Sequence, residues 1–294
     1  MIVVTAPTSH IGSKVVNNLL DVSISLRLVV RGVTKPSAAI RDRTEVVEGS
    51  HGDASVVGHA FEGADAVFWL APPDPAKTLE EAFIEFTRPA AEAIRHHGVL
   101  RVVSITALGR GTHWQDRAGP VTASIRMDDM LMASGAAFRG LAMPSFMENT
   151  ARQAVSIGKE GLFFGPIGPD RKLPLTATRD MAAVAARLLG NALWHGQEEV
   201  PVLGPKDLSF DDQAAIVSDV IGREVRYQQI SFDRFKQQFL DRGASESFAQ
   251  GYVDMYRAKD EGIDNATLRT SENTVPTSFR MFCEQVLKPA VASS

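Results

Sequence analysis

The first half of the chain alternates short β-rich runs with longer stretches of helical pattern. Six such runs predict strands, at residues 2–5, 26–31, 45–47, 66–70, 101–106 and 138–143. The first helix between them is predicted by apolar side chains at helical spacing, namely Ile11, Val15, Val16, Leu19 and Leu20. Parallel strands need crossover connections, so strand, helix and strand in repetition predict a parallel sheet with helices on both faces. The expected class is α/β, with a Rossmann-type doubly wound sheet.

The regular alternation of predicted strands and helices ends after Pro144. Residues 158–174 are rich in glycine and proline and predict loops with a short hairpin. Beyond them we predict helices at 179–189, 210–221, 232–240, 246–257 and 277–287, and strands at 200–203 and 225–230. We therefore expect a nucleotide-binding domain over residues 1–150, to which the helix near 179–190 returns. A smaller mixed α/β substrate or cap subdomain is expected over 151–294.

Composition excludes several classes of protein. The 294 residues are 44% hydrophobic and 22% charged, with a net charge of −4, which is typical of a globular protein and not of a nucleic-acid binder. Cys283 is the single cysteine, so no internal disulfide framework is possible, and no metal-binding motif is present. No apolar stretch approaches the roughly 20 residues that span a bilayer. With no secretory signal pattern, we expect a cytoplasmic protein.

The segment between the first strand and the first helix lies where a phosphate-binding loop is expected, because helix N-termini favour anions. Glycines in such a loop normally serve the turn, the approach of the pyrophosphate and the packing of helix on strand. Only the third glycine is present, as Gly12, while Ala6 and Ser9 occupy the first two positions. Pro7 contributes no backbone amide.

The segment Thr5-x-x-Thr8-x-x-Ile11-Gly12 resembles the TGATGxIG loop of atypical short-chain dehydrogenases, in particular the NmrA-like family. Three later segments are also similar to this family: residues 136–149, which end in Met-Pro-Ser-Phe-Met-Glu-Asn, residues 203–212, and residues 258–262. The resemblance covers nearly the whole chain. It implies a Rossmann fold that binds a nicotinamide cofactor and acts on a small molecule, and some relatives are regulators that bind a protein partner.

The end of the second strand favours NADP(H) over NAD(H). An NAD enzyme would favour an acidic residue there for the ribose 2′-hydroxyl. This chain has Arg31 followed by Lys35, cations suited to a 2′-phosphate. Asp53, after the third strand, resembles the family residue that approaches the adenine, although a turn or cap role is equally common for an aspartate. The predicted cofactor site comprises Thr5, Thr8, Ser9, His10, Ile11, Gly12, Arg31, Lys35, Asp53, Ala71, Thr106, Pro144 and Phe146.

The usual catalytic pair of short-chain dehydrogenases is missing. These enzymes use Tyr-x-x-x-Lys, in which the lysine lowers the pKa of the tyrosine that donates a proton. Here Pro120 and Ser124 stand at the two positions, and Met143 replaces the arginine that usually precedes Pro144. His113 follows the fifth strand, where substrate loops gather, and is the candidate proton donor.

Three functions are compatible with these features. The first is an NADPH-dependent reductase of flat, conjugated acceptors of the quinone, azo or iminium type, because hydride transfer to an electron-poor acceptor depends mainly on positioning. The second is a catalytically inactive NADP(H)-sensing regulator that binds a protein partner. The third is a non-redox tailoring enzyme that reuses the fold. A homodimer is compatible with each, and no membrane partner is expected.

Overall fold

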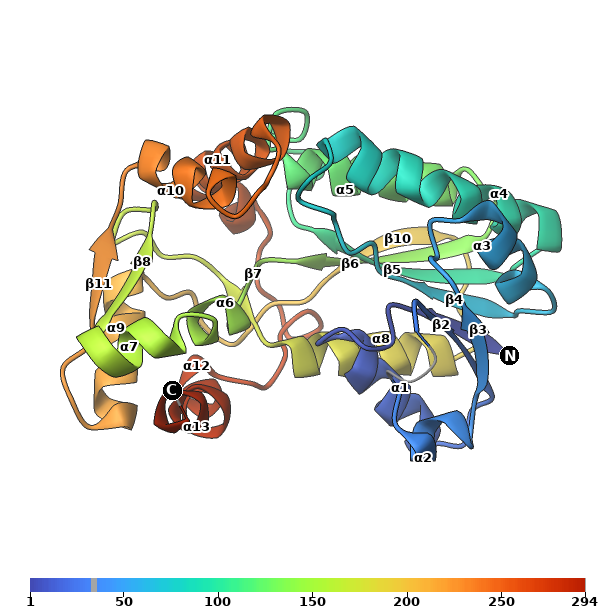
Figure 1. Ribbon diagram of the computed structural model, residues 1–294, viewed down its shortest axis with the longest axis horizontal. Helices are drawn as coiled ribbons and strands as arrows, with labels where there is room; N and C mark the ends of the chain where they lie inside the picture. Colours follow the sequence, from blue (N-terminus) through green and yellow to red (C-terminus); the bar gives the residue numbers. More distant parts are fainter. Residues whose placement is uncertain (33–35, 294) are drawn as a thin grey trace. The chain divides into compact units, whose positions relative to one another are not determined.

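The computed structural model describes residues 1–32 and 36–293 (Figure 1). The chain divides into two compact units that interleave along the sequence. Unit 1 comprises Met1–Ala107, Thr122–Ala142 and Met181–Val200. Unit 2 comprises Leu108–Val121, Met143–Asp180 and Pro201–Ser294.

Unit 1 is built on a seven-stranded sheet of order β10-β6-β5-β4-β1-β2-β3. The strands are β1 (Ile2–Thr5), β2 (Leu26–Val30), β3 (Glu45–Glu48), β4 (Ala66–Trp69), β5 (Arg101–Ala107), β6 (Ala137–Met143) and β10 (Gln197–Pro201). The neighbours from β5 through β4, β1 and β2 to β3 all pair in parallel. The strand order reverses at β1, which lies between β2 and β4. Ligands of such sheets bind at the carboxyl ends of the strands near this switch point.

Helices cover both faces of this sheet, which confirms the predicted Rossmann-type α/β fold (Figure 1). The helices are α1 (Gly12–Asp21), α2 (Ala38–Arg41), α3 (Ala54–Phe61), α4 (Phe86–His97), α5 (Pro120–Met132) and α8 (Thr178–Gly190), with a π-helical segment, Glu80–Glu85, leading into α4. In Figure 1, α3, α4 and α5 lie on one face, and α1 and α8 on the other. The helix α1 buries the predicted apolar side, with Val15, Val16 and Leu19 at most 1% exposed.

Unit 2 contains two short parallel sheets and a set of helices. Its strands are β7 (Ser145–Phe146), β8 (Leu162–Gly165), β9 (Leu175–Thr176) and β11 (Arg226–Gln229). Its helices are α6 (Glu148–Ala151), α7 (Ala154–Glu160), α9 (Phe210–Ile221), α10 (Phe232–Leu240), α11 (Glu246–Asp260), α12 (Phe279–Phe282) and α13 (Lys288–Ala292), with a 3-10 turn at Ile263–Ala266 and a π-helical turn at Cys283–Leu287.

The short hairpin predicted within residues 158–174 is wrong. Instead β8 pairs in parallel with β11, with Leu162 opposite Arg226. The connection between them includes α9, as a parallel pair requires. Turn-forming residues predict only local reversals of the chain, and this pairing joins segments about 60 residues apart.

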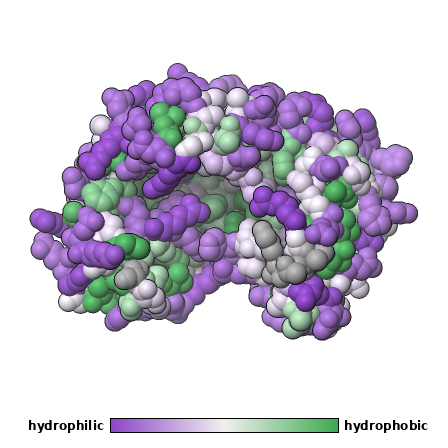
Figure 2. Space-filling model, viewed as in Figure 1, coloured by the Kyte–Doolittle hydropathy of each residue, from purple (hydrophilic) through white to green (hydrophobic). Residues whose placement is uncertain are grey.

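Most of the surface visible in Figure 2 is hydrophilic. The described residues include no helix that is both long enough and apolar enough to cross a membrane.

Candidate cofactor and acceptor sites

The loop between β1 and α1 keeps the geometry of a phosphate-binding loop. A Cβ atom at Gly12 would lie 2.2 Å from the carbonyl oxygen of Ala6, so only glycine fits there. The loop closes through a hydrogen bond from the Ser9 amide to the same carbonyl, at 3.0 Å. Gly12 therefore allows the close approach of helix to loop that the third glycine of such motifs provides.

Ala6 adopts a glycine-like backbone conformation. Its φ angle is +47°, in the left-handed region that residues with a Cβ atom rarely enter. The first glycine of the motif has been replaced, but the turn that needed it is still made. The backbone therefore follows the course of a glycine-containing loop at the cost of local strain.

Backbone amides of the loop provide donors for an anion. Ser9 Oγ accepts from the Gly12 amide at 3.0 Å and so occupies one donor of the first helical turn. The amides of Thr8, His10 and Ile11 donate no hydrogen bond within the described part of the chain. Unpaired amides at the N-terminus of a ten-residue helix are suited to a pyrophosphate. These three predicted residues thus lie together with Ser9 and Gly12.

Lys14 adds a positive charge at this loop that the sequence analysis missed. Its Nζ donates to the carbonyl oxygen of His10 at 3.0 Å, which holds the ammonium group beside the unpaired amides. A cation two residues after Gly12 on the first helical turn is the signal that could have identified it.

Thr5 holds the start of the loop against β4 through its side chain. Its hydroxyl donates to the carbonyl oxygen of Phe68 at 2.9 Å and accepts from the amide of Leu70 at 3.0 Å. The side chain is fully buried. Thr5 therefore joins the carboxyl ends of β1 and β4, and its hydroxyl is committed to the fold.

Arg31 directly follows β2, as predicted for a residue that meets a 2′-phosphate. Its side chain is exposed and makes no ion pair within the described residues. Lys35, the second predicted cation, lies outside the described residues.

Asp53 caps α3. Its Oδ1 accepts from both the amide and the hydroxyl of Ser55, each at 2.9 Å, and these bonds lower the pKa of the carboxyl group. This is the cap role that an aspartate before a helix often has.

His51, two residues earlier, is a buried group that the sequence analysis did not assign. Its Nε2–H donates to the carbonyl oxygen of Leu70 at 3.0 Å. Its ring packs edge-on against Trp69 and Phe86, with centroid distances of 5.2 and 4.9 Å. Burial, with a smaller contribution from Arg31, lowers the pKa of His51 from 6.5 to about 4, so the ring is neutral at physiological pH.

The last two predicted residues of unit 1 follow adjacent strands. Ala71 comes shortly after β4 and is 7% exposed, and Thr106 lies near the carboxyl end of β5. The hydroxyl of Thr106 is buried and has no partner among the described residues. A buried polar atom without a partner is costly, so Thr106 is suited to a polar group of a bound ligand. Together with the unpaired amides of the loop, it shows that unit 1 fits a dinucleotide.

Unit 2 contains a cavity of about 470 Å³ with an aromatic lining. Its aromatic side chains are Phe146, Phe163, Phe164, Phe210, Phe235, Phe239 and Tyr256. Polar side chains on or next to β7, α6, α7, α9 and α10 also line it: Ser145, Asn149, Thr150, Arg152, Gln153, Ser156, Glu160, Gln213, Gln238 and Arg242. The volume and the planar walls suit a flat organic molecule. Phe146 was predicted as a cofactor-binding residue, and the structure places it in the lining of this cavity of unit 2. Pro144, one residue before β7, is buried.

The three tyrosines of the chain all belong to unit 2, and one of them lines the cavity. Tyr227 donates to the carbonyl oxygen of Ile167 at 2.8 Å and stacks on Phe210 at 4.4 Å between ring centroids. Tyr256 lines the cavity, packs against Phe235 at 4.6 Å, and has its pKa raised by burial to about 12. A phenol with this pKa stays protonated near neutral pH, so its O–H can donate a hydrogen bond.

His113 is not among the residues that line this cavity. It is exposed on the loop after Gly111, with its ring 5.2 Å from that of Trp114. The guanidinium of Arg117 covers Trp114 at 4.4 Å from the ring centroid. The proposed role of His113 as proton donor stays a prediction.

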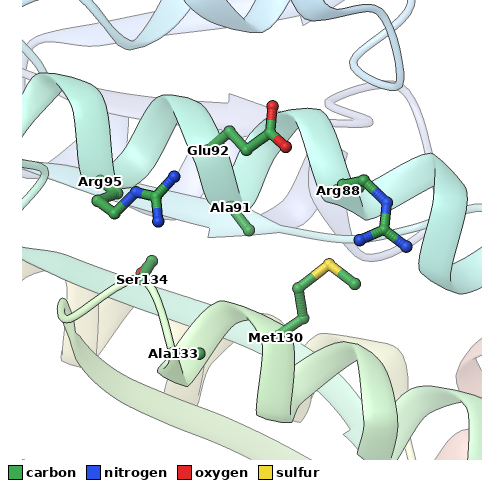
Figure 3. Close-up of a pocket in the computed structure, with 7 residues that line it drawn as sticks. All are labelled: Arg88, Ala91, Glu92, Arg95, Met130, Ala133 and Ser134. Atoms are coloured by element: carbon green, nitrogen blue, oxygen red, sulfur yellow. The ribbon is translucent and has the colours of Figure 1, made fainter.

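A second cavity, of about 190 Å³, lies between α4 and the end of α5 (Figure 3). Its lining includes Arg88, Glu92, Arg95 and Met130. Helices that follow parallel strands begin at the carboxyl edge of the sheet and run away from it. This cavity extends along α4 from Arg88 to Arg95 and reaches the residues that follow α5, so it lies toward the opposite edge of the sheet from the phosphate loop.

Comparison with known proteins identifies the family. The model of a family described as NAD(P)H-binding matches residues 8–192, and the chain belongs to this family. An NAD(P)H azoreductase of Xenophilus azovorans is 28% identical over 284 residues, which cover 97% of this chain and 96% of that protein.

Solved structures share the fold. The NADPH-dependent quinone oxidoreductase of Escherichia coli in complex with NADPH matches with a TM-score of 0.80 at 22% identity, covering 96% of this chain and 98% of the other. The triphenylmethane reductase of Citrobacter sp. with NADP(H) matches with a TM-score of 0.77 at 19% identity, covering 100% and 99%. The expected membership of the atypical short-chain dehydrogenases and the nicotinamide cofactor are confirmed.

Proposed function

We propose that this protein is an NADPH-dependent oxidoreductase that reduces flat, conjugated acceptors without a tyrosine–lysine pair. Unit 1 binds the cofactor, and the cavity of unit 2 binds the acceptor. The aromatic lining of that cavity is the observation that carries the proposal, because ring faces bind planar conjugated molecules. The names of the relatives, an azoreductase and a quinone oxidoreductase, support an acceptor of this type.

In unit 1 the residues position the cofactor. The amides of Thr8, His10 and Ile11 bind the pyrophosphate, with the helix dipole of α1 and the ammonium of Lys14 adding favourable charge. Arg31 binds the 2′-phosphate through charge-assisted hydrogen bonds. When bound, the nicotinamide supplies a hydride.

In unit 2 the residues orient the acceptor and exclude water. Phe235 and Phe239 project from one side of α10 at a spacing of four residues, and Tyr256 packs against Phe235. The protonated phenol of Tyr256 donates a hydrogen bond to an acceptor heteroatom and helps to orient it. The proton that completes reduction comes from His113 or from solvent, because the dyad positions hold Pro120 and Ser124.

The test combines binding with turnover. Purified protein is titrated with NADPH and NADH by fluorescence, and oxidation of the reduced cofactor is then followed with a panel of quinones and azo compounds. Replacing Phe239 by Ala should raise the KM for the acceptor and leave NADPH affinity unchanged. Phe232→Ala, on the same helix but outside the cavity, is the matched control. Tight NADPH binding without turnover of any acceptor would contradict the proposal.

A second candidate is a regulator that senses NADP(H). The replacement of the catalytic pair by Pro120 and Ser124 favours it, since Pro120 starts α5 and Ser124 is buried one turn later. A sensor must respond differently to NADPH and NADP+. A ligand changes the balance between two conformations of a protein only when it binds one of them more tightly than the other. A large ratio of the affinities for NADPH and NADP+, without turnover, would support this function.

A further inference from the structure

We propose that the acceptor bound in the cavity of unit 2 carries an anionic group, such as a carboxylate, sulfonate or phosphate ester, which Arg152 and Arg242 bind. This inference rests on the proposed function, since it assigns the ligand of the same cavity. It narrows that ligand from any flat conjugated molecule to a planar molecule with an oxyanion at one end.

Two arginines from separate elements line the one cavity. Arg152 follows α6, and Arg242 comes two residues after the end of α10. Both residues are exposed, and neither side chain makes an ion pair or hydrogen bond within the part of the chain that the structure describes. Their guanidinium groups are available to a ligand.

Several other arginines of unit 2 have a partner. Arg269 pairs with Asp207, and Arg280 pairs with Asp219 at 2.6 Å. Arg223 donates to two backbone carbonyl groups near the end of α7. Arg152 and Arg242 differ from these three arginines, because they have no protein partner among the described residues and both line one cavity, where their charge can act on a ligand.

Arg152 interacts electrostatically with two tyrosine side chains, one of which lines the cavity. Its charge acts on the phenols of Tyr252 and Tyr256, where it opposes the rise in pKa caused by burial. Arg152 and Tyr256 both line the cavity, and the effect of the Arg152 charge on the Tyr256 phenol relates the two side chains electrostatically. A ligand there is favoured when it offers oxygen acceptors and negative charge.

The remaining polar groups leave the cavity with an excess of positive charge. Glu160 is its one acidic lining residue, against the two arginines. The amide of Gln153 is occupied, since its Nε2 donates to the carbonyl oxygen of Phe164 at 3.0 Å and its Oε1 accepts from the amide of Phe164 at 2.8 Å. The charge of the lining therefore disfavours a cationic acceptor, such as an iminium compound, and favours an anionic one.

The test measures binding without cofactor or turnover. The probes are naphthalene-2-sulfonate and naphthalene-2-sulfonamide, which share the ring and differ in charge, and their affinities are measured by calorimetry. We expect the sulfonate to bind about tenfold or more tightly, the lower end of the range for hydrogen bonds to charged groups, because both arginines are exposed. Raising the ionic strength should reduce this preference.

The variants identify the groups responsible. Replacing both Arg152 and Arg242 by Ala should abolish the preference for the sulfonate and leave the affinity for the sulfonamide within about twofold. Replacing both arginines by Lys should retain part of the preference for the sulfonate. Lysine keeps the positive charge but lacks the paired N–H donors with which a guanidinium group binds an oxyanion. Arg234→Ala is the matched control, since it removes an exposed arginine of α10 that does not line the cavity.

Equal affinities of the two probes for the unaltered protein would overturn the inference. It would also be overturned if Arg234→Ala reduced the preference for the sulfonate as much as the double variant does. Failure of both probes to bind would overturn it as well, because the cavity would then not accept a planar aromatic molecule. Reduction of neutral and sulfonated naphthoquinones is measured separately. A protein that prefers the sulfonate but oxidises no NADPH would retain the anion site and lose the proposed oxidoreductase function.

Discussion

The buried ring of His51 should make the stability of the protein fall in mild acid. Its pKa is lowered to about 4 in the folded state, whereas an exposed histidine has 6.5. Between these values the unfolded chain binds a proton that the folded chain does not, so stability decreases as the pH falls below 6.5. One pH unit in this window corresponds to about 1.36 kcal/mol.

The size of the loss in unfolding free energy follows from the pH range between the two pKa values of His51. Between pH 6.5 and about pH 5 the unfolded state gains about 1.5 × 1.36, or roughly 2 kcal/mol, relative to the folded state. The variant His51→Gln removes this titration and keeps an amide N–H that can donate to Leu70. The glutamine side chain loses the ring contacts that His51 makes with Trp69 and Phe86. The free energy of unfolding of the variant should therefore be about 1–2 kcal/mol lower at neutral pH.

The assay is urea unfolding of both proteins from about pH 7.5 to about pH 5. The unaltered protein is more stable than His51→Gln by about 1–2 kcal/mol at neutral pH, and this advantage should fall by about 2 kcal/mol over the range, so that it vanishes or reverses at about pH 5. His59→Gln, which removes an exposed histidine of α3, is the control and should show the same pH dependence as the unaltered protein. Parallel curves for the unaltered protein and His51→Gln would refute the reasoning, because they would show that the ring titrates equally in both states.

Three further predictions concern the cofactor and the proton. Arg31→Ala should weaken NADPH binding by about 1.5–3 kcal/mol and leave NADH binding nearly unchanged in a fluorescence titration, whereas equal losses would assign Arg31 to the fold. Ala6→Gly should raise the unfolding free energy by about 0.5 kcal/mol, because about 1–2 kcal/mol of left-handed strain is relieved and about 0.5–1 kcal/mol is lost through the entropy of the unfolded chain. A loss of stability in that variant would show that the φ angle of Ala6 is not strained. His113→Ala should lower kcat about a hundredfold if the imidazole donates the proton, and an unchanged pH–rate profile would leave solvent as the source.

The periodicity of the sequence predicted the parts of the fold that local patterns determine. The inner strands β1, β2, β4, β5 and β6 are largely buried, so they read as nearly continuous apolar runs. The helix α9 begins at a capping residue that the sequence shows. This residue is Ser209, since its hydroxyl and the carboxylate of Asp212 cap α9 reciprocally. The parallel pairing of β8 with β11 has no such local signal.

The candidate site was predictable to the same extent. Gly12 and Arg31 have positions fixed by the neighbouring strand and helix, and both lie where the pattern placed them. The hydroxyl of Thr5 joins β1 to β4 because of a contact across 63 residues, which spacing along the chain does not reveal. The cavity of unit 2 is assembled from five separated segments, and only tertiary packing brings Phe146, Phe164 and Phe239 together.

The backbone of Ala6 has a consequence for the evolution of the loop. Alanine and glycine codons differ at a single base, so the missing glycine is one mutation away from a turn that already has the required dihedral angle. Genetic drift can therefore exchange the two residues without rebuilding the loop, at an effect on stability of about 1 kcal/mol or less. Homologues with a degenerate glycine signature are better found by comparing main-chain torsion angles than by searching for the letters of the motif.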